Sequence, residues 1–414
     1  MKRRQFLQAA GALAIAGCAT PGEAGRPRVL VIGGGFGGAT VAKYVRLWDP
    51  GIDVMLVDRS EEFVSCPISN LVLGGNRTMR DITHRYDGLR KYGVQLLTGD
   101  AVAVDSTKKF VTFGRGSVLT YDRLVISPGV DFLFDEVEGY AGQDRILHAW
   151  KAGLQTVELR RQLEAMPDGG VYVLSVPPAP YRCPPGPYER ACQVAHYFRQ
   201  AKPRSKVLVL DANPDVTSKP ALFKRAWEDL YKGIVEFRPN SKVVAVDAKA
   251  MTVRTDFDTV KGDVLNIVPP QRAADIAVKA GLITHNNRWC DVDWRTMESK
   301  AVRGIHVLGD ATLSATGMPK SGHMANSHAK VAAAALVEML NGREPNPNPV
   351  MNNTCYSFVS DKEVIHVASV HQYDPGQNTI IPVKGAGGVS AARSELEGSY
   401  GWSWARNIWA DMLT

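Results

Sequence analysis

Short runs of aliphatic and β-branched residues recur along this chain, and each run ends at a glycine or a polar residue. Residues 28–32 (RVLVI) and 53–58 (DVMLVD) have this form, which is typical of buried parallel strands. Residues 37–47, between them, carry a helical pattern. Together the three segments predict a βαβ unit close to the N-terminus.

The turn inside this unit is rich in glycine. Gly33, Gly35 and Gly38 form a Gly-x-Gly-x-x-Gly pattern, and Asp58 ends the second predicted strand. Such glycines let the backbone approach a pyrophosphate, the helix N-terminus supplies N–H donors, and the acid accepts from a ribose hydroxyl. The glycines alone would also fit a structural turn, but the strand, the helix and the acid around them favour a dinucleotide site.

A second unit of the same kind is predicted from strands at residues 169–175 and 206–211. The loop after its first strand differs, because residues 176–191 read VPPAPYRCPPGPYERA. Proline has no N–H to donate and stiffens the loop. We therefore expect a second Rossmann-like fold that has lost NAD(P)H binding. Cys183 in this loop is either a buried cysteine or a positioned thiol, and the prolines on both sides favour the thiol.

The last third of the chain repeats the strand and helix signals. Residues 300–311 predict a strand ending in Gly309 and Asp310, where the acid could hold a ribityl hydroxyl or cap a helix. Residues 322–340 predict a helix whose N-terminus would favour negative charge on a reduced flavin. A linker at 342–349 precedes residues 350–414, which carry Cys355 and three tryptophans that could be core or could wall a flavin pocket.

Length and charge set limits on the function. The 414 residues indicate two or three domains, and no apolar run after the N-terminus is long enough to cross a bilayer. The net charge is +7, but Lys2, Arg3 and Arg4 contribute to it and no dense basic stripe follows. This mild excess of positive charge suits an acidic protein partner or an anionic substrate better than nucleic acid.

The N-terminus has the form of an export signal. Arg3 and Arg4 precede a short apolar run and small residues, which favours twin-arginine export to the periplasm over a frayed amphipathic helix. Residues 15–18 (IAGC) also resemble a lipoprotein cleavage box, in which Cys18 would be lipidated and anchor the protein to a membrane. An incidental cysteine near an ordinary cleavage site is the alternative.

The six cysteines show no metal or haem motif. There is no Cys-x-x-Cys, so a thioredoxin-like motif and a c-type haem site are both absent from the sequence, and no zinc-ligand spacing occurs. Cys192 and Cys290 lack charged surroundings and are interpreted as structural. An exported chain would meet an oxidising compartment, in which a disulfide can persist.

From Arg28 onward the chain resembles the flavoprotein subunit of flavocytochrome c sulfide dehydrogenase, a glutathione-reductase-like flavoprotein. The segments that carry the resemblance begin at Cys183 (CPPGPYERA), Ile267 (IVPPQRA), Gly304 (GIHVLGDA), Met318 (MPKSG) and Asn353 (NTCYS). It implies an α/β fold with two Rossmann-like domains of the FAD/NAD(P)-binding type and a C-terminal flavin-side domain. The expected boundaries are 1–25 for signal and linker, 26–145 with 287–345 for the FAD domain, 146–286 for the NAD-like domain, and 346–414.

The resemblance also implies roles for individual residues. Cys183 and Cys355 correspond to a redox disulfide beside the flavin, Glu189 to a nearby carboxylate and Trp404 to a nearby aromatic side chain. Cys66 corresponds to a cysteine that binds FAD covalently, although Pro67 beside it leaves the covalent bond open. Hydrosulfide would attack the disulfide, giving a persulfide and a thiolate that reduces FAD. The implied partner is a c-type cytochrome subunit, which would carry the haem.

Three other functions compete with this interpretation. A sulfide:quinone oxidoreductase would need an apolar quinone slot and usually membrane-seeking C-terminal helices. An NADH dehydrogenase is disfavoured by the proline-filled second loop. A non-enzymatic flavin-binding or electron-relay protein would not need both Cys183 and Cys355.

Overall fold

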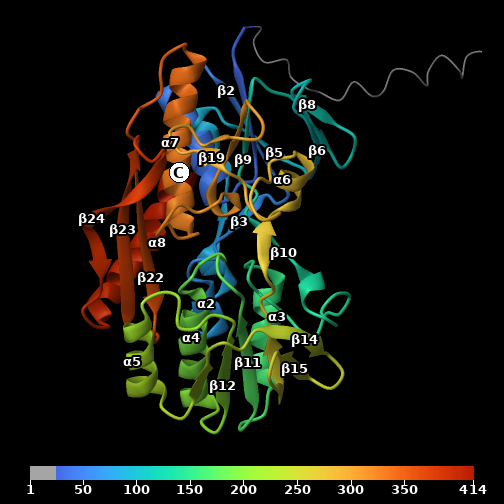
Figure 1. Cartoon of the computed structure of the whole chain (residues 1–414), viewed down its shortest axis with the longest axis vertical. Helices are drawn as coiled ribbons and strands as arrows, with labels where there is room; N and C mark the ends of the chain where they lie inside the picture. Colours follow the sequence, from blue (N-terminus) through green and yellow to red (C-terminus); the bar gives the residue numbers. More distant parts are fainter. Residues whose placement is uncertain (1–24) are drawn as a thin grey trace, which may run out of the picture.

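The computed structural model describes residues 25–414, which form two lobes and a C-terminal layer along one side of both (Figure 1). The βαβ unit expected near the N-terminus is present. β1 (Arg28–Ile32) and β2 (Asp53–Asp58) run parallel, and α1 (Phe36–Trp48) connects them. The strand interiors are buried, as expected for a parallel sheet covered on both faces.

The sheet of the first lobe is assembled from two separate parts of the chain. Its strands lie in the order β19 (Val292–Asp293), β20 (Glu298–Ser299), β21 (Ile305–Val307), β9 (Arg123–Ile126), β1, β2 and β5 (Gln95–Thr98). The five strands from β21 to β5 are parallel, whereas β19 and β20 pair antiparallel at one edge. The glycine turn after β1 therefore lies at the centre of the sheet, at the carboxyl ends of the parallel strands.

Two further layers complete the first lobe. α7 (Gly322–Leu340) has the predicted bounds and packs along α1. A second, antiparallel sheet is formed by β6 (Ala101–Asp105), β7 (Phe110–Phe113) and β8 (Val118–Thr120). Shorter elements follow β2: β3 (Glu62–Val64), α2 (Ser69–Leu73), η1 (Met79–Ile82), β4 (Thr83–Arg85) and η2 (Asp87–Tyr92).

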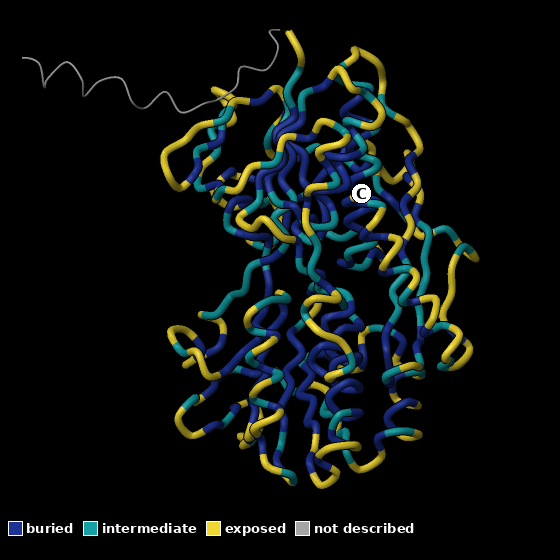
Figure 2. Tube along the Cα trace, turned by 180° about the vertical axis from the view of Figure 1, so that it is seen from behind, coloured by how far each residue is buried: buried dark blue, intermediate teal, exposed yellow. Residues whose placement is uncertain are grey.

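The second lobe contains the second parallel unit. Its strands lie in the order β13 (Val235–Arg238), β12 (Lys206–Asp211), β11 (Val171–Val176) and β17 (Val264–Asn266). The helices are α3 (Leu154–Ala165), α4 (Gly186–Ala201) and α5 (Pro220–Tyr231), and β14 (Val243–Asp247), β15 (Thr252–Thr255) and β16 (Thr259–Lys261) form an antiparallel sheet. Tyr172, Phe198 and Phe223 are fully buried in this lobe. Figure 2 shows that each lobe has its own buried interior.

The chain crosses between the lobes at a pair of short antiparallel strands, β10 (Val130–Phe132) and β18 (Gln271–Ala273). After β10 and η3 (Phe134–Glu136), Val137 already packs in the core of the second lobe. After β18, Ile276 of α6 (Asp275–Lys279) packs in the core of the first lobe. Both crossings thus lie several residues before the boundaries at 146 and 287 expected from the sequence.

The C-terminal layer contacts both lobes. β22 (Val350–Phe358), β23 (Val364–Asp374) and β24 (Thr379–Val389) form an antiparallel sheet beside α7 and α5 (Figure 1), and α8 (Glu395–Leu413) packs on β22, β23 and α1. Within residues 25–414, no helix combines the length and the apolar character needed to cross a membrane.

Candidate active site

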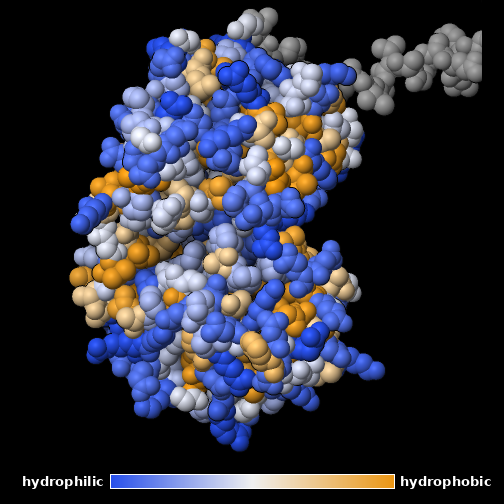
Figure 3. All heavy atoms as spheres, in the orientation of Figure 1, coloured by the Kyte–Doolittle hydropathy of each residue, from blue (hydrophilic) through white to orange (hydrophobic). Residues whose placement is uncertain are grey.

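A cavity of about 610 Å³ lies between the glycine turn of β1, the N-termini of α7 and α4, and the C-terminal sheet. This volume is within the usual range for a cofactor site. The space-filling view shows the surface hollowed between the two lobes (Figure 3). The predicted site residues that line the cavity are Gly33, Gly35, Asp58, Cys66, Cys183, Glu189, Gly309, Asp310, Cys355 and Trp404.

The glycine turn leaves room and donors for an anionic group. A Cβ atom on Gly35 would meet no atom within 4 Å, and no side chain caps α1, which begins after this residue. The first N–H groups of α1 are therefore available to a pyrophosphate.

Gly38 was predicted to bind the cofactor, but it does not line the cavity. A Cβ on Gly38 would lie 1.7 Å from the carbonyl oxygen of Gly33. This glycine instead allows α1 to pack close against β1.

Asp58 keeps its position at the end of β2 and lines the cavity. Its Oδ2 atom accepts the backbone N–H of Gly34 at 2.6 Å, and its Oδ1 atom accepts that of Ser60 at 2.9 Å. Each carboxylate oxygen can accept more than one hydrogen bond, so both can still receive a ribose hydroxyl.

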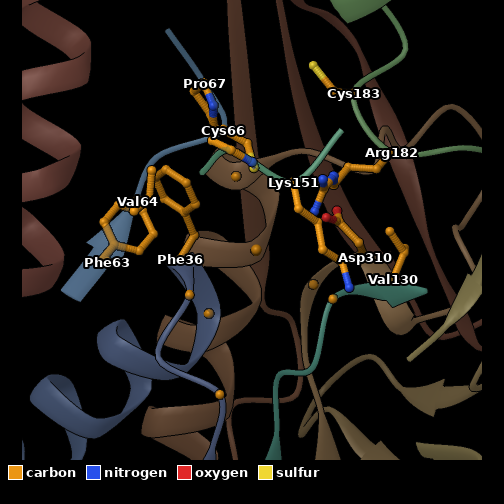
Figure 4. A pocket seen from close by; sticks show the side chains of 18 of the residues that line it. Phe36, Phe63, Val64, Cys66, Pro67, Val130, Lys151, Arg182, Cys183 and Asp310 are labelled. Carbon is orange, nitrogen blue, oxygen red and sulfur yellow. The ribbon is translucent and has the colours of Figure 1, made fainter. Parts of the chain in front are cut away.

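Asp310 and Arg182 carry polar atoms without a hydrogen-bond partner. Oδ1 of Asp310 and Nη2 of Arg182 are buried, and neither has a partner among the described residues. The two side chains point toward one another in the cavity (Figure 4), and burial raises the pKa of Asp310 while Arg182 and Lys320 lower it. Unsatisfied acceptors and donors at a cavity wall fit a hydroxyl-rich chain such as the ribityl group, so the residues present fit FAD.

Cys183 and Cys355 reach the same cavity from distant segments. Cys183 lies in the proline-rich loop with φ +59°, and its N–H donates to the carbonyl of Lys320 at 2.8 Å, while Cys355 lies in β22. Both are free thiols in the structure, and burial raises the pKa of each. The structure thus places both cysteines at the cavity, and the disulfide between them stays a prediction.

Glu189 is held by two hydrogen bonds at the start of α4. Its Oε1 atom accepts the N–H of Phe358 at 2.8 Å, and its Oε2 atom accepts the side-chain amide of Asn70 at 2.7 Å. Arg190 fixes that amide in turn, since its Nε donates to Oδ1 of Asn70 at 3.0 Å. Burial raises the pKa of Glu189, and these hydrogen bonds partly oppose the rise.

The sulfur atom of Cys66 faces the cavity from the segment before α2 (Figure 4). It accepts the N–H of Ala152 at 3.4 Å. The contact fixes the position of the thiol, and the covalent bond to FAD stays a prediction.

Of the three C-terminal tryptophans, one lines the cavity and the others pack in or against the core. Trp404 lines the cavity, and its indole N–H donates to Nδ1 of His323 at 3.4 Å. Trp409 is buried in the core of the first lobe, and Trp402 packs edge-on against it. Only Trp404 of these three contributes to the cavity wall.

The end of β12 differs from that of a usual dinucleotide-binding fold. Asp211 ends β12, where a dinucleotide-binding fold presents an acid to the ribose, but this residue is fully buried. It accepts the hydroxyl of Tyr188 at 2.7 Å and the backbone N–H of Asn213 at 2.8 Å. The proline-rich loop and the hydrogen-bonded Asp211 agree with the predicted loss of NAD(P)H binding, which stays a prediction.

Three family descriptions match this chain. Residues 27–163 match pyridine nucleotide-disulphide oxidoreductases, residues 156–269 the central part of the sulfide dehydrogenase [flavocytochrome c] flavoprotein chain, and residues 347–413 the flavin-binding part of flavocytochrome c sulphide dehydrogenase. A curated flavoprotein chain of that enzyme, from Chlorobaculum thiosulfatiphilum, is 58% identical over 48 residues, which are 12% of this chain and 100% of the curated sequence. The chain belongs to the flavocytochrome c sulfide dehydrogenase flavoprotein family.

Sulfide:quinone oxidoreductases are similar to this flavocytochrome c-type flavoprotein as well. The mitochondrial enzyme of Dictyostelium discoideum is 23% identical over 69% of this chain and 65% of its own length. The matched region thus spans just under two thirds of that relative. The solved sulfide:quinone oxidoreductase from Aquifex aeolicus superimposes with a TM-score of 0.74 at 20% identity, covering 93% of this chain and 91% of that one. This likeness confirms the predicted α/β pyridine nucleotide-disulfide oxidoreductase fold.

Sequence reasoning missed several residues around the site. Arg182 lies beside Cys183, so its place in the proline loop was the one available signal. Asn70 and Lys219 follow no motif, and their roles depend on contacts with segments far away in the sequence.

Proposed function

We propose that this flavoprotein oxidises sulfide, passing electrons through Cys183 and Cys355 to FAD and then to a c-type cytochrome subunit. The observation that carries the proposal is the convergence of these two cysteines and Glu189 on one cavity. The proline-rich loop and the buried, hydrogen-bonded Asp211 in the second lobe support it. A nicotinamide donor has no site of the usual kind here. A small anion needs only the cavity and a sulfur to attack.

The proposed reaction begins on the disulfide form of the two cysteines. Hydrosulfide attacks one sulfur, the S–S bond breaks, and a persulfide forms on one cysteine while the other becomes a thiolate. FAD supplies an acceptor that takes two electrons and can release them singly. Glu189 is placed to take the remaining proton from the persulfide or to return one to the thiolate.

Anaerobic reduction of the purified holoprotein tests this function. Sulfide is expected to bleach the flavin absorbance rapidly in a stopped-flow instrument, whereas NADH at the same concentration is expected to leave it unchanged. Rapid bleaching by NADH and none by sulfide would overturn the proposal.

The electron acceptor is a separate part of the proposal. The family match supports a cytochrome, whereas the similarity to sulfide:quinone oxidoreductases supports a quinone as the second candidate. Sulfide-dependent turnover with cytochrome c and with a short-chain ubiquinone analogue, compared at equal concentration, separates them. Faster turnover with the quinone would contradict the cytochrome.

Export and lipidation belong to the proposal too, because residues 1–24, including Cys18, lie outside the described residues. We propose twin-arginine export to the periplasm, which would suit a protein that receives FAD before it crosses the membrane. Replacing Arg3 and Arg4 by lysine should retain the protein in the cytoplasm, and replacing Cys18 by serine should release any membrane-bound fraction. Unchanged fractionation would contradict each claim.

The covalent bond at Cys66 gives a direct prediction. Acid precipitation of the wild-type protein should leave the yellow flavin on the polypeptide, and the C66S variant should release it to the supernatant. The buried Cys290 provides the control, since C290S should keep its flavin bound. Free FAD from the fully loaded wild type would rule out the covalent bond and leave the fold intact.

Glu189 gives a prediction about pH. Since burial raises the pKa of Glu189, its carboxylate form should be lost, and with it the rate of sulfide-dependent reduction, as the pH falls through that raised value. E189Q should slow the reduction by about 10²–10³-fold and remove this acidic limb. Dividing the wild-type profile by that of E189Q cancels the ionisation of sulfide itself.

The half-buried Glu158 on α3, which does not line the cavity, provides the matched carboxylate control. E158Q should keep the wild-type profile. An E189Q profile parallel to that of the wild type would show that Glu189 transfers no proton in the rate-determining range.

A further inference from the structure

Lys219 is a buried lysine beside the cysteine pair that the proposed reaction has not used. It precedes α5, and its Nζ atom donates to the carbonyl of Cys355 at 3.1 Å, to Oγ of Ser357 at 2.8 Å and to the carbonyl of Ile365 at 3.4 Å. All three acceptors are neutral. Among the described residues, no carboxylate lies within ion-pair distance of this ammonium group.

A buried ammonium group without a counter-ion is costly. Burial lowers the pKa of Lys219 to about 8, so the side chain is still mostly protonated at pH 7. The ionisable groups that face it are, in order of effect, Cys355, Glu189, Cys183 and Glu397. Cys355 acts most strongly on Lys219, and it gains a negative charge only when the disulfide opens.

The two cysteines differ in their surroundings. Lys219 lowers the pKa of the Cys355 thiol against the effect of burial, and hydrogen bonds with Asn353 and Ser321 lower it further, while Glu189 raises it. The charged groups around Cys183 mostly raise the pKa of its thiol. Besides burial, its pKa is raised by Cys355, Glu189 and Asp310 and lowered by Arg182. Lys219 interacts less strongly with Cys183 than with Cys355.

We propose that Lys219 is the counter-ion of the Cys355 thiolate and so directs the attack of hydrosulfide onto Cys183. The proposal rests on the sulfide-oxidising function above. Hydrosulfide bonds to the sulfur of Cys183, the S–S bond breaks, and its electron pair leaves on Cys355, giving a Cys183 persulfide and a Cys355 thiolate. The sulfur that is the better leaving group departs, and Lys219 determines which sulfur that is. Lys219 acts through Cys355 and does not touch the substrate.

Alkylation of the reduced holoenzyme tests this role without sulfide or an electron acceptor. The protein is reduced, freed of reductant without oxygen, and pulsed with iodoacetamide across a pH series, and the labelled Cys355 and Cys183 peptides are quantified by mass spectrometry. In the wild type, the pH at which alkylation is half-maximal (the midpoint) should be lower for Cys355 than for Cys183. In K219M, the Cys355 midpoint should rise by about 1–3 pH units, which is a 10- to 1000-fold loss of thiolate at fixed pH.

Two variants control for charge and for burial. K219R keeps the cation and should keep the Cys355 midpoint near that of the wild type. Lys202 is a buried lysine whose Nζ also donates to backbone carbonyls, those of Glu164 and Met166, far from the cavity. K202M should leave both cysteine midpoints unchanged even if it lowers stability.

An unchanged Cys355 midpoint in K219M overturns the proposal, as does an equal shift in K202M. If K219M does not fold, the wild-type protein alone still tests the proposal. A wild-type Cys355 midpoint equal to or above that of Cys183 overturns the proposed role of Lys219. The two proposals fail separately. A flavin that sulfide cannot reduce would contradict the function and leave this titration in place, whereas a failed titration would leave sulfide oxidation standing.

Discussion

The C355S variant is expected to lose reduction of the flavin by sulfide, to less than about one thousandth of the wild-type rate, while its FAD content stays normal. Without Cys355 no disulfide can form, so hydrosulfide has no sulfur to attack and no route for its electrons. Cys355 also lies in β22 with its backbone paired to Val367, and serine keeps that pairing. Stopped-flow bleaching by sulfide measures the loss, and dithionite should still reduce the flavin.

Cys192 provides the control for this result. It is buried in α4 and does not line the cavity, so C192S should bleach at the wild-type rate. The flavin of C355S, once reduced by dithionite, should still be reoxidised by a one-electron acceptor. Rapid bleaching of C355S by sulfide would refute the disulfide mechanism.

The G38A variant is expected to lose about 3 kcal/mol or more of its free energy of unfolding and to retain little FAD. The added Cβ would lie 1.7 Å from the carbonyl oxygen of Gly33, so α1 would have to move away from β1. The oxygen belongs to the backbone and the position of Cβ is fixed by the backbone of residue 38, so no side-chain rotation can relieve the overlap. Urea unfolding followed by circular dichroism measures the loss of stability.

Gly35 provides a matched comparison three residues earlier. A Cβ there meets nothing within 4 Å, so G35A should unfold at the wild-type urea concentration. G35E should also fold, but its longer side chain would occupy the cavity and exclude FAD. Equal stability of G38A and G35A would show that Gly38 has no packing role, and normal FAD content in G35E would place the cofactor elsewhere.

The elements with continuous apolar runs could be predicted from the sequence. β1, β2 and β12 have the predicted bounds because all their interior positions are buried. α7 begins where Ser321 accepts the N–H of Met324, an N-terminal cap that a sequence can signal. The crossings at β10 and β18 could not be located, because three-residue strands carry too short a pattern.

The candidate site was predicted unevenly for a related reason. Gly33, Asp58 and Asp310 follow a local rule at the ends of parallel strands, and the structure places all three at the cavity. Lys219 is different, since its contacts with Cys355 and Ile365 exist only after the C-terminal sheet has packed on the second lobe. No local sequence pattern predicts a buried lysine whose hydrogen-bond partners lie far along the chain.

The division of the first sheet also bears on synthesis by the ribosome. β9 pairs with β21, which is translated only after the whole second lobe. At roughly 5–20 residues per second, the edge of β9 stays open on the order of ten seconds or longer, and an open edge invites wrong pairing. The second lobe is continuous in sequence and can close during that time. We expect the second lobe to fold first on the ribosome, and the first lobe, with the glycine turn, to finish last.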